Sequence, residues 1–285
     1  MVNEPPQDTP RRRRPRMTRR GWLALGAGLV AVAALAVLVP LLLLKQPPAV
    51  PPPEKPTMLL VPEGWRASQV YEAADKALKV APGTTRRTAE AGTLKLPADA
   101  LGNPEGFLFP ATYPVYRKTT PRGLLDYMVR TAHQRFGADR ITSGAQRNGV
   151  SLYQTVTIAS VVQAEADTPE DMGKVARVIH NRLAQGMTLQ MDSTLNYGLG
   201  RSTLDTSHAD TRMDNPYNTY NRQGLPPTPI GNPGEQAMHA AVDPPAGDWL
   251  YFVTVRPGDT RFTADYTEHL RNVEEFNAQR ASAAD

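Results

Sequence analysis

The longest hydrophobic stretch of the chain runs from Gly21 to Leu44 and contains no charged residue. As a helix, this run is long enough to cross a hydrocarbon core of about 30 Å. A cleavable signal peptide has a shorter apolar part, roughly 7 to 15 residues, followed by a cleavage site of small residues. Here the run ends in leucines followed by Lys45. The pattern therefore predicts an uncleaved transmembrane helix over residues 21–44.

After Lys45, apolar residues recur at the periods of both helices and strands. "TMLLVPEGW" predicts a short strand and a turn, and "WLYFVTV" with "TRFTA" predicts a hairpin. Because helices and strands mix without a regular βαβ alternation, the predicted fold class is α+β. The segment 103–116, rich in proline and aromatic residues, is predicted as an irregular, semi-exposed connection. Helices are predicted over residues 66–80, 121–137, 151–166, 168–186 and 266–279.

Charge is distributed unevenly along the 285 residues, although the formal total is only +4. Seven arginines lie within the first 20 residues, and the chain after Lys45 is near neutral. Arginines ahead of an apolar run predict a cytoplasmic tail over 1–20, with everything after the helix outside the cytoplasm. The near-neutral remainder offers no basic surface for nucleic acid. The absence of cysteine excludes disulfides, thiolate metal sites and thiol nucleophiles.

Composition also divides the part of the chain after the apolar run. Residues 45–57 are rich in proline and lack apolar periodicity, which predicts an extended spacer. The remainder is interpreted as a small unit with its connection over 58–116 and a larger domain over 117–285. Because the small unit buries little surface by itself, it is expected to pack against the larger domain.

The most informative polar residue is Glu165, at the end of "IASVVQAEAD". It prolongs the apolar stripe of Ile158, Val161 and Val162 on the predicted helix, whereas Gln163 points about 200° away. A carboxyl group at the edge of an apolar face has a raised pKa and can act as a general acid. The alternative is that the helix ends here and that Glu165 is solvated. Periodicity alone leaves both possibilities open.

Two other polar sites are weighed and set aside. Glu105, in "PEGFLFP", is a candidate second acid, but the Pro-Glu-Gly sequence favours an exposed turn. His208, Asp210 and Asp214 resemble a set of metal ligands, but no further residue lies at a suitable spacing, which favours a polar loop. No metal site and no cofactor are predicted.

Two long series of motifs, over residues 159–200 and 215–253, resemble the YceG-like domain of the endolytic murein transglycosylases. "VPEGW" and "EGFLFPATY" fit the upstream signatures of that family, so that the resemblance extends from Met58 to the C-terminus. It implies a small LysM-like unit followed by a mixed catalytic domain. Longer relatives have a further LysM-like segment next to the membrane, and the spacer here runs almost directly into Met58.

The resemblance implies a membrane-anchored enzyme that cuts nascent peptidoglycan glycan strands between N-acetylmuramic acid and N-acetylglucosamine. Such enzymes leave a 1,6-anhydro-muramyl end and use no water in the reaction. Many members have two acids where this chain has Gln163 and Glu165, so the catalytic role falls on Glu165. Penicillin-binding proteins are possible partners of an enzyme that acts on nascent strands.

Five hydrogen-bonding side chains in "LQMDSTLNYGLG" and "NPYNTYN" are candidates for the glycan groove. Each has a structural alternative, as a buried aromatic residue, a turn residue or a local cap. Two further functions stay open, namely a catalytically inert glycan-binding scaffold and a glycoside hydrolase that uses the same acid. The groove candidates are Gln190, Asp192, Tyr197, Asn218 and Tyr220.

Overall fold

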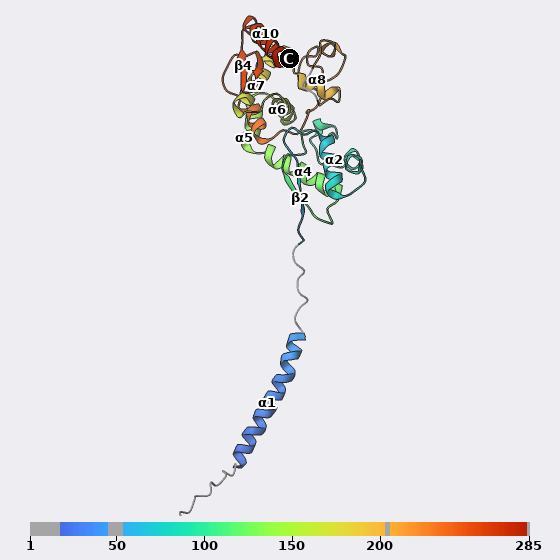
Figure 1. Ribbon diagram of the computed structural model, residues 1–285, viewed down its shortest axis with the longest axis vertical. Coiled ribbons are helices and arrows are strands. Elements are labelled where there is room, and N and C mark those ends of the chain that lie inside the picture. The colour runs from blue at the N-terminus through green and yellow to red at the C-terminus, as the bar shows by residue number, and fades with distance from the viewer. Residues whose placement is uncertain (1–17, 45–53, 203–205, 284–285) are drawn as a thin grey trace, which may run out of the picture. The chain divides into compact units, whose positions relative to one another are not determined.

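The computed structural model describes residues 18–44, 54–202 and 206–283. The chain divides into two compact units, Met1–Glu54 and Lys55–Asp285. Most of the predicted basic tail and of the proline-rich spacer lies outside the described residues. The described helices and strands are α1 (Arg19–Leu44), β1 (Thr57–Leu60), α2 (Ala67–Leu78), α3 (Thr84–Glu90), η1 (Ala98–Ala100), β2 (Thr112–Val115), α4 (Pro121–Phe136), α5 (Asp139–Arg147), α6 (Leu152–Glu165), α7 (Pro169–Ala184), α8 (Asp192–Gly198), η2 (Asp210–Arg212), α9 (Glu235–Val242), β3 (Tyr251–Arg256), β4 (Asp259–Thr263) and α10 (Tyr266–Ala283) (Figure 1).

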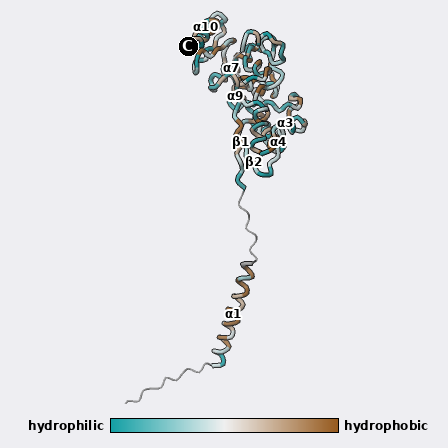
Figure 2. Tube along the Cα trace, turned by 45° about the vertical axis from the view of Figure 1, so that its right-hand side comes forward, coloured by the Kyte–Doolittle hydropathy of each residue, from teal (hydrophilic) through white to brown (hydrophobic). Residues whose placement is uncertain are grey.

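The first unit contains the apolar helix α1. Figure 2 shows hydrophobic residues along most of its length. Residues 19–42 are long and apolar enough to cross a membrane, with a mean hydropathy of 2.6, and none of them is buried. Trp22, Leu29 and Val30 are each 70% exposed. A surface of this kind, hydrophobic all round, is that of a membrane span or a signal sequence.

The second unit begins with a two-stranded antiparallel sheet and two helices. β1 pairs with β2 so that Leu59 lies opposite Tyr113. α2 turns Val70 and Ala74 inward, and both are fully buried. These side chains form one hydrophobic cluster, which also includes Leu124, Leu125, Met128 and Val129 of α4. The strand and the helix predicted from 57–80 are confirmed.

The segment 103–116 differs from its prediction, because it is buried and ends in the strand β2 rather than being semi-exposed. Phe107, Leu108 and Phe109 are at most 6% exposed. The chain bends at Leu108, and consecutive side chains reach different clusters. Accordingly, Leu108 belongs to the cluster around α2, whereas Phe107 and Phe109 belong to the second cluster. The segment therefore forms the boundary between two parts of the core, which the local pattern of prolines concealed.

The second hydrophobic cluster surrounds α6, which packs against α5, α7, α8 and α9. The side chains from Thr155 to Val162 are all buried. Both central helices begin at a residue whose side chain caps the first turn. Ser151 caps α6 by accepting a hydrogen bond from the Gln154 N–H, and Thr168 caps α7 by accepting one from the Asp171 N–H.

The C-terminal part confirms the predicted hairpin and closing helix. β3 and β4 are antiparallel, with Phe252 opposite Phe262, and α10 packs against both strands. Two separate two-stranded sheets among many helices agree with a mixed α+β fold. The short helices α3, α5, α8 and α9 were not predicted. α8 has seven residues, which is too short for a clear helical period.

Candidate active site

Glu165 is the last residue of α6, and the chain leaves the helix in an extended conformation at Ala166. Val161 and Val162, on the preceding turn, are fully buried. The apolar stripe thus ends on a carboxyl group that is only half-buried. Gln163 lies on another face of the helix, where its side-chain oxygen accepts a hydrogen bond from the Gly234 N–H.

Hydrogen bonds to Glu165 come from the beginning of α8. The Ser193 hydroxyl donates to Glu165 Oε1 at 2.5 Å, and the Ser193 N–H donates to the same oxygen at 3.3 Å. Burial raises the pKa of Glu165, the two bonds from Ser193 lower it, and the nearby charge of Asp192 raises it. The result is a raised pKa, which favours a protonated acid.

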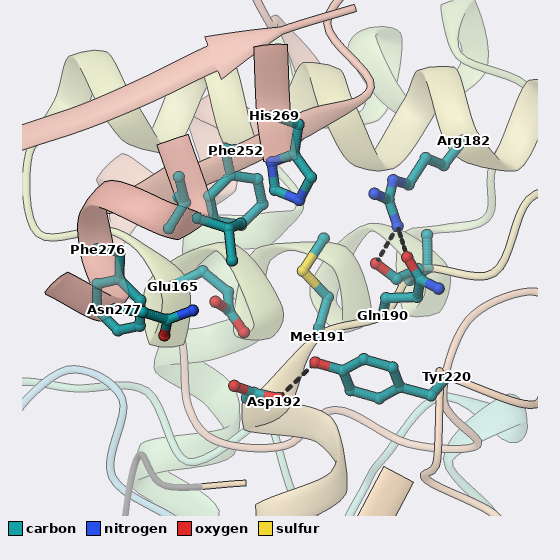
Figure 3. A pocket seen from close by; sticks show the side chains of 13 residues that line it. Glu165, Arg182, Gln190, Met191, Asp192, Tyr220, Phe252, His269, Phe276 and Asn277 are labelled. Carbon is teal, nitrogen blue, oxygen red and sulfur yellow. Dashed lines mark hydrogen bonds between the residues drawn. The ribbon is translucent and has the colours of Figure 1, made fainter. Parts of the chain in front are cut away.

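Glu165 faces a cavity of about 370 Å³ (Figure 3). Helix α7 and the segment 189–192 form one side of it, and β3 and α10 contribute the other. The view shows the Glu165 carboxyl group among Phe276, Asn277, Asp192 and Met191. The cavity is lined by Glu165, Arg182, Leu189, Gln190, Met191, Asp192, Tyr220, Phe252, Val253, His269, Val273, Phe276 and Asn277.

Three of the five groove candidates lie in this cavity with Glu165. The Tyr220 hydroxyl donates to Asp192 Oδ1 at 2.6 Å. Gln190 has a backbone φ of +54°, and its side-chain oxygen accepts a hydrogen bond from Arg182 Nη1 at 3.1 Å. The cavity therefore offers a carboxylate, a phenol and an amide at one end of α6, a set of groups that suits a ligand with many hydroxyls.

The other two candidates lie outside the residues that line this cavity. The Tyr197 hydroxyl donates to Glu105 Oε2 at 3.0 Å. Asn218 is fully buried, and its amide donates to the carbonyls of Thr211 and Met213. Tyr197 is half-buried with its hydroxyl bonded, and Asn218 holds a loop, which are contacts of the kind that the structural alternatives describe.

Glu105 is not in an exposed turn, so that prediction is wrong. Its side chain is 4% exposed, and burial raises its pKa to about 7. The next residue, Gly106, has a φ of +85°, and a Cβ there would lie 2.7 Å from Pro229 and 2.8 Å from Val156. The turn is thus pressed against the core, where only glycine fits.

Sequence reasoning missed three polar residues at this site, Ser193, Arg182 and His269. Arg182 is 5% exposed and donates to the carbonyls of Thr188, Leu189 and Leu250 as well as to Gln190. It shares an apolar face of α7 with Val175 and Ile179, which is the periodicity that indicated Glu165. Ser193 and His269 have no comparable local signal.

The acidic residues around His208 have other partners. Asp210 pairs with Arg201 at 3.0 Å and accepts hydrogen bonds from Ser207, and Asp214 pairs with Arg222 at 2.7 Å. Within the described ranges, no group of three or more His, Cys, Asp or Glu residues is arranged to hold a metal ion.

Comparison with known proteins gives consistent matches. The model of the YceG-like family matches residues 19–275. The endolytic murein transglycosylase of Bacillus subtilis (strain 168) is 35% identical over 173 residues, which are 60% of this chain and 48% of that protein. The enzyme of the same name from Streptococcus pneumoniae serotype 2 is 33% identical over 177 residues, 60% of this chain and 32% of that protein. The chain thus matches about half or less of the length of these curated relatives.

A solved structure matches more of the chain. The crystal structure of a YceG-like protein from Listeria monocytogenes has a TM-score of 0.68 and 29% sequence identity. It covers 76% of this chain and 75% of that one. The likeness therefore extends beyond short motifs to most of the folded part.

Proposed function

Because this chain belongs to the YceG-like family, we propose that it is a membrane-anchored endolytic lytic transglycosylase. It would cleave the bond between N-acetylmuramic acid and N-acetylglucosamine inside nascent peptidoglycan strands and leave 1,6-anhydro-N-acetylmuramic acid ends. The observation that carries the proposal is Glu165, a carboxyl group with a raised pKa at the edge of a polar cavity. The names of the relatives from Bacillus and Streptococcus support the same activity.

One carboxyl group suffices for this chemistry. Hydrolytic glycosidases use two, one as an acid and one to activate water or to attack the sugar carbon. Here the protonated Glu165 would donate its proton to the glycosidic oxygen as the bond to C1 breaks. The resulting carboxylate would then remove the proton of the C6 hydroxyl as that oxygen bonds to C1. The proton returns to Glu165, so atoms and charges balance over the cycle.

The other polar groups of the cavity would bind the sugar. Asp192 is a second carboxyl group near Glu165, and as a carboxylate it would stabilise the positive charge that develops on the ring. Tyr220 holds Asp192 through the 2.6 Å hydrogen bond, and Gln190 is held by Arg182. We propose Gln190, Asp192 and Tyr220 as substrate-binding residues on this basis.

Mass spectrometry of glycan ends tests this function. Purified peptidoglycan strands are incubated with the full chain in detergent, and the masses of the new strand ends are measured. Anhydro ends support the proposal. Reducing ends would indicate a hydrolase that uses the same acid. Uncut strands that still bind the protein would indicate a glycan-binding scaffold.

We also propose the topology and the domain division. α1 would anchor the chain in the cell membrane with the N-terminus in the cytoplasm and the catalytic part outside. The segment 58–116, with most of the two-stranded sheet and two helices, would be the LysM-like unit with its connection, and residues 117–285 the catalytic domain. Action on nascent strands would place the enzyme beside penicillin-binding proteins.

Protease added to intact spheroplasts tests the topology. The large domain should be digested, whereas a tag at the N-terminus should stay protected. If the tag is digested and the domain is protected, the orientation of α1 is the opposite of the proposed one. A domain already free in the medium before protease is added would mean that α1 is cleaved as a signal.

A further inference from the structure

The short helix α8 lies between two buried or half-buried carboxyl groups. Ser193, near its beginning, donates its N–H and hydroxyl to Glu165. Tyr197, four residues later and on the same side of the helix, donates its hydroxyl to Glu105 Oε2 at 3.0 Å. Because one rigid turn of helix joins Ser193 to Tyr197, a movement at one contact displaces the other.

Glu105 is the fixed end of this arrangement. Its Oε1 accepts the N–H of Ala67, the first residue of α2, at 2.8 Å and the Asn232 amide at 3.4 Å. The same Asn232 amide donates to the Trp65 carbonyl at 2.8 Å. Glu105 therefore joins the beginning of α2 and the loop around Asn232 to Tyr197 of α8.

A second contact holds the same end of α8. The Arg66 guanidinium lies over the Tyr197 ring, 4.9 Å from its centre, and donates to the Arg201 carbonyl at 2.6 Å. At its beginning, α8 is held by the hydrogen bond between the hydroxyls of Thr194 and Thr219. Tyr220 also holds the first residue of the helix, Asp192, and Asn215 Nδ2 donates to the carbonyl of its last residue, Gly198. The contacts at Tyr197 act together with these bonds to set the orientation of α8.

We propose that Glu105 and Tyr197 are positioning residues for catalysis, which fix α8 against α2 and thereby hold Ser193 on the Glu165 carboxyl group. The motifs "VPEGW" and "PEGFLFP" then acquire a role, because they supply the Trp65 carbonyl and Glu105. The first helix of the small N-terminal unit is in this way a mechanical part of the active site. This inference rests on the proposed role of Glu165.

The contact has a chemical consequence at Glu165. The hydrogen bonds from Ser193 favour the carboxylate, so their loss raises the pKa of Glu165 further. The other titratable or charged groups that face this cavity are Asp192, Tyr220, Arg182 and His269, and none of them is bonded to Tyr197 or Glu105 in the described structure. Because Glu165 must start protonated, the loss of activity at high pH follows its ionisation.

The test compares Tyr197→Phe, Ser193→Ala and the double variant in the full chain in detergent, with glycan cutting followed across pH. In each single variant, the high-pH limb of the pH–rate profile should shift to higher pH. The kcat should fall on the order of tenfold, with KM nearly unchanged. The double variant should move the limb no further than Ser193→Ala alone, since both act through one contact. Additive shifts, or an unshifted limb in Tyr197→Phe, would overturn the proposal.

Glu105→Gln is the matched control that separates positioning from acid catalysis. Its amide oxygen still accepts the Ala67 N–H, and its NH₂ group can donate to the Tyr197 hydroxyl oxygen. Positioning therefore predicts that this variant keeps most of its activity. If Glu105 were itself a proton donor, Glu105→Gln would be as inactive as Glu165→Gln, and the proposal would be wrong.

A measurement without turnover keeps the inference separate from the proposed function. Side-chain carboxyl ¹³C NMR titrates Glu165 directly, with the signal assigned from its absence in Glu165→Gln. The pH at the midpoint of the Glu165 titration should be higher in Ser193→Ala and in Tyr197→Phe than in the parent. An unchanged midpoint in Tyr197→Phe overturns the inference, even in a protein that cuts glycan. If instead the proposed function is wrong, the parent chain leaves glycan strands uncut. That result does not depend on the titration midpoints of Glu165.

Discussion

Glu105 and Glu165 are two carboxyl groups with raised pKa values in different surroundings. Glu105 is only 4% exposed, at the wall of a separate cavity of about 420 Å³, and its two oxygens accept hydrogen bonds from Ala67, Tyr197 and Asn232. Glu165 is half-buried, faces a cavity of about 370 Å³, and receives its described hydrogen bonds from Ser193. A raised pKa reports burial in both cases. Glu165 is the more exposed of the two and has an oxygen, Oε2, with no described hydrogen bond, so its access to a substrate distinguishes it as the candidate catalyst.

Replacing each acid by its amide should give the largest contrast. Glu165→Gln keeps the size of the side chain but cannot exchange a proton, so glycan cutting should fall at least about 10²-fold. Thermal unfolding, measured on the same preparation, should stay close to that of the parent. A Glu165→Gln protein that cuts at nearly the parent rate would remove the distinction between the two acids.

The pH dependence of stability should depend on Glu105. Its folded pKa of about 7 lies above the ordinary value of 4.5, so the folded state binds this proton more tightly. Its contribution to the free energy of unfolding is present in full below pH 4.5 and is lost as pH rises to 7. The loss is about 3 kcal/mol for one group. Urea unfolding across this range should show a smaller decline in Glu105→Gln than in the parent.

A residual decline should remain in Glu105→Gln, because Glu165 has a shift of the same sign. If parent and variant declined equally, Glu105 would not be the buried proton-binding group described here.

Truncating each acid to alanine should reverse their order: Glu105→Ala should lose more stability than Glu165→Ala, although Glu165 matters more for cutting. Glu105→Ala leaves the Ala67 N–H and the Tyr197 hydroxyl without their acceptor, which should cost about 2 kcal/mol of unfolding free energy. Glu165→Ala removes a half-buried group with one partner residue and should change stability by less than about 1 kcal/mol. Urea unfolding at neutral pH measures both. Equal losses would mean that Glu165 is as much a structural residue as Glu105.

The smallest effect on cutting is expected at Gln163, two residues before Glu165. Gln163→Ala loses the hydrogen bond from the Gly234 N–H and should cost about 1 kcal/mol of stability. Because this side chain lies outside the cavity residues, the cutting rate should stay close to that of the parent. If Gln163→Ala lowered the cutting rate as much as Glu165→Gln does, Gln163 would also be required for the reaction.

The sequence by itself determined the features that repeat locally. Apolar periodicity placed α4, α6, α7 and the hairpin. The spacing of Ile158, Val161 and Val162 placed Glu165 at the end of an apolar stripe, and the family resemblance gave it the catalytic role. The same rule on α7, with Val175 and Ile179, would have indicated Arg182. Because these signals lie within a few residues of one another, they can be recognised without knowledge of the fold.

Only the tertiary structure decided what surrounds these residues. "PEG" is the local signal of an exposed turn, and Glu105 is buried because Val156 and Pro229 pack against Gly106. Ser193 meets Glu165 from 28 positions away, at the beginning of a helix too short to show a period. His269 reaches the cavity because α10 packs on β3. Such contacts depend on how separate elements pack, and a local pattern records only the face that an element buries.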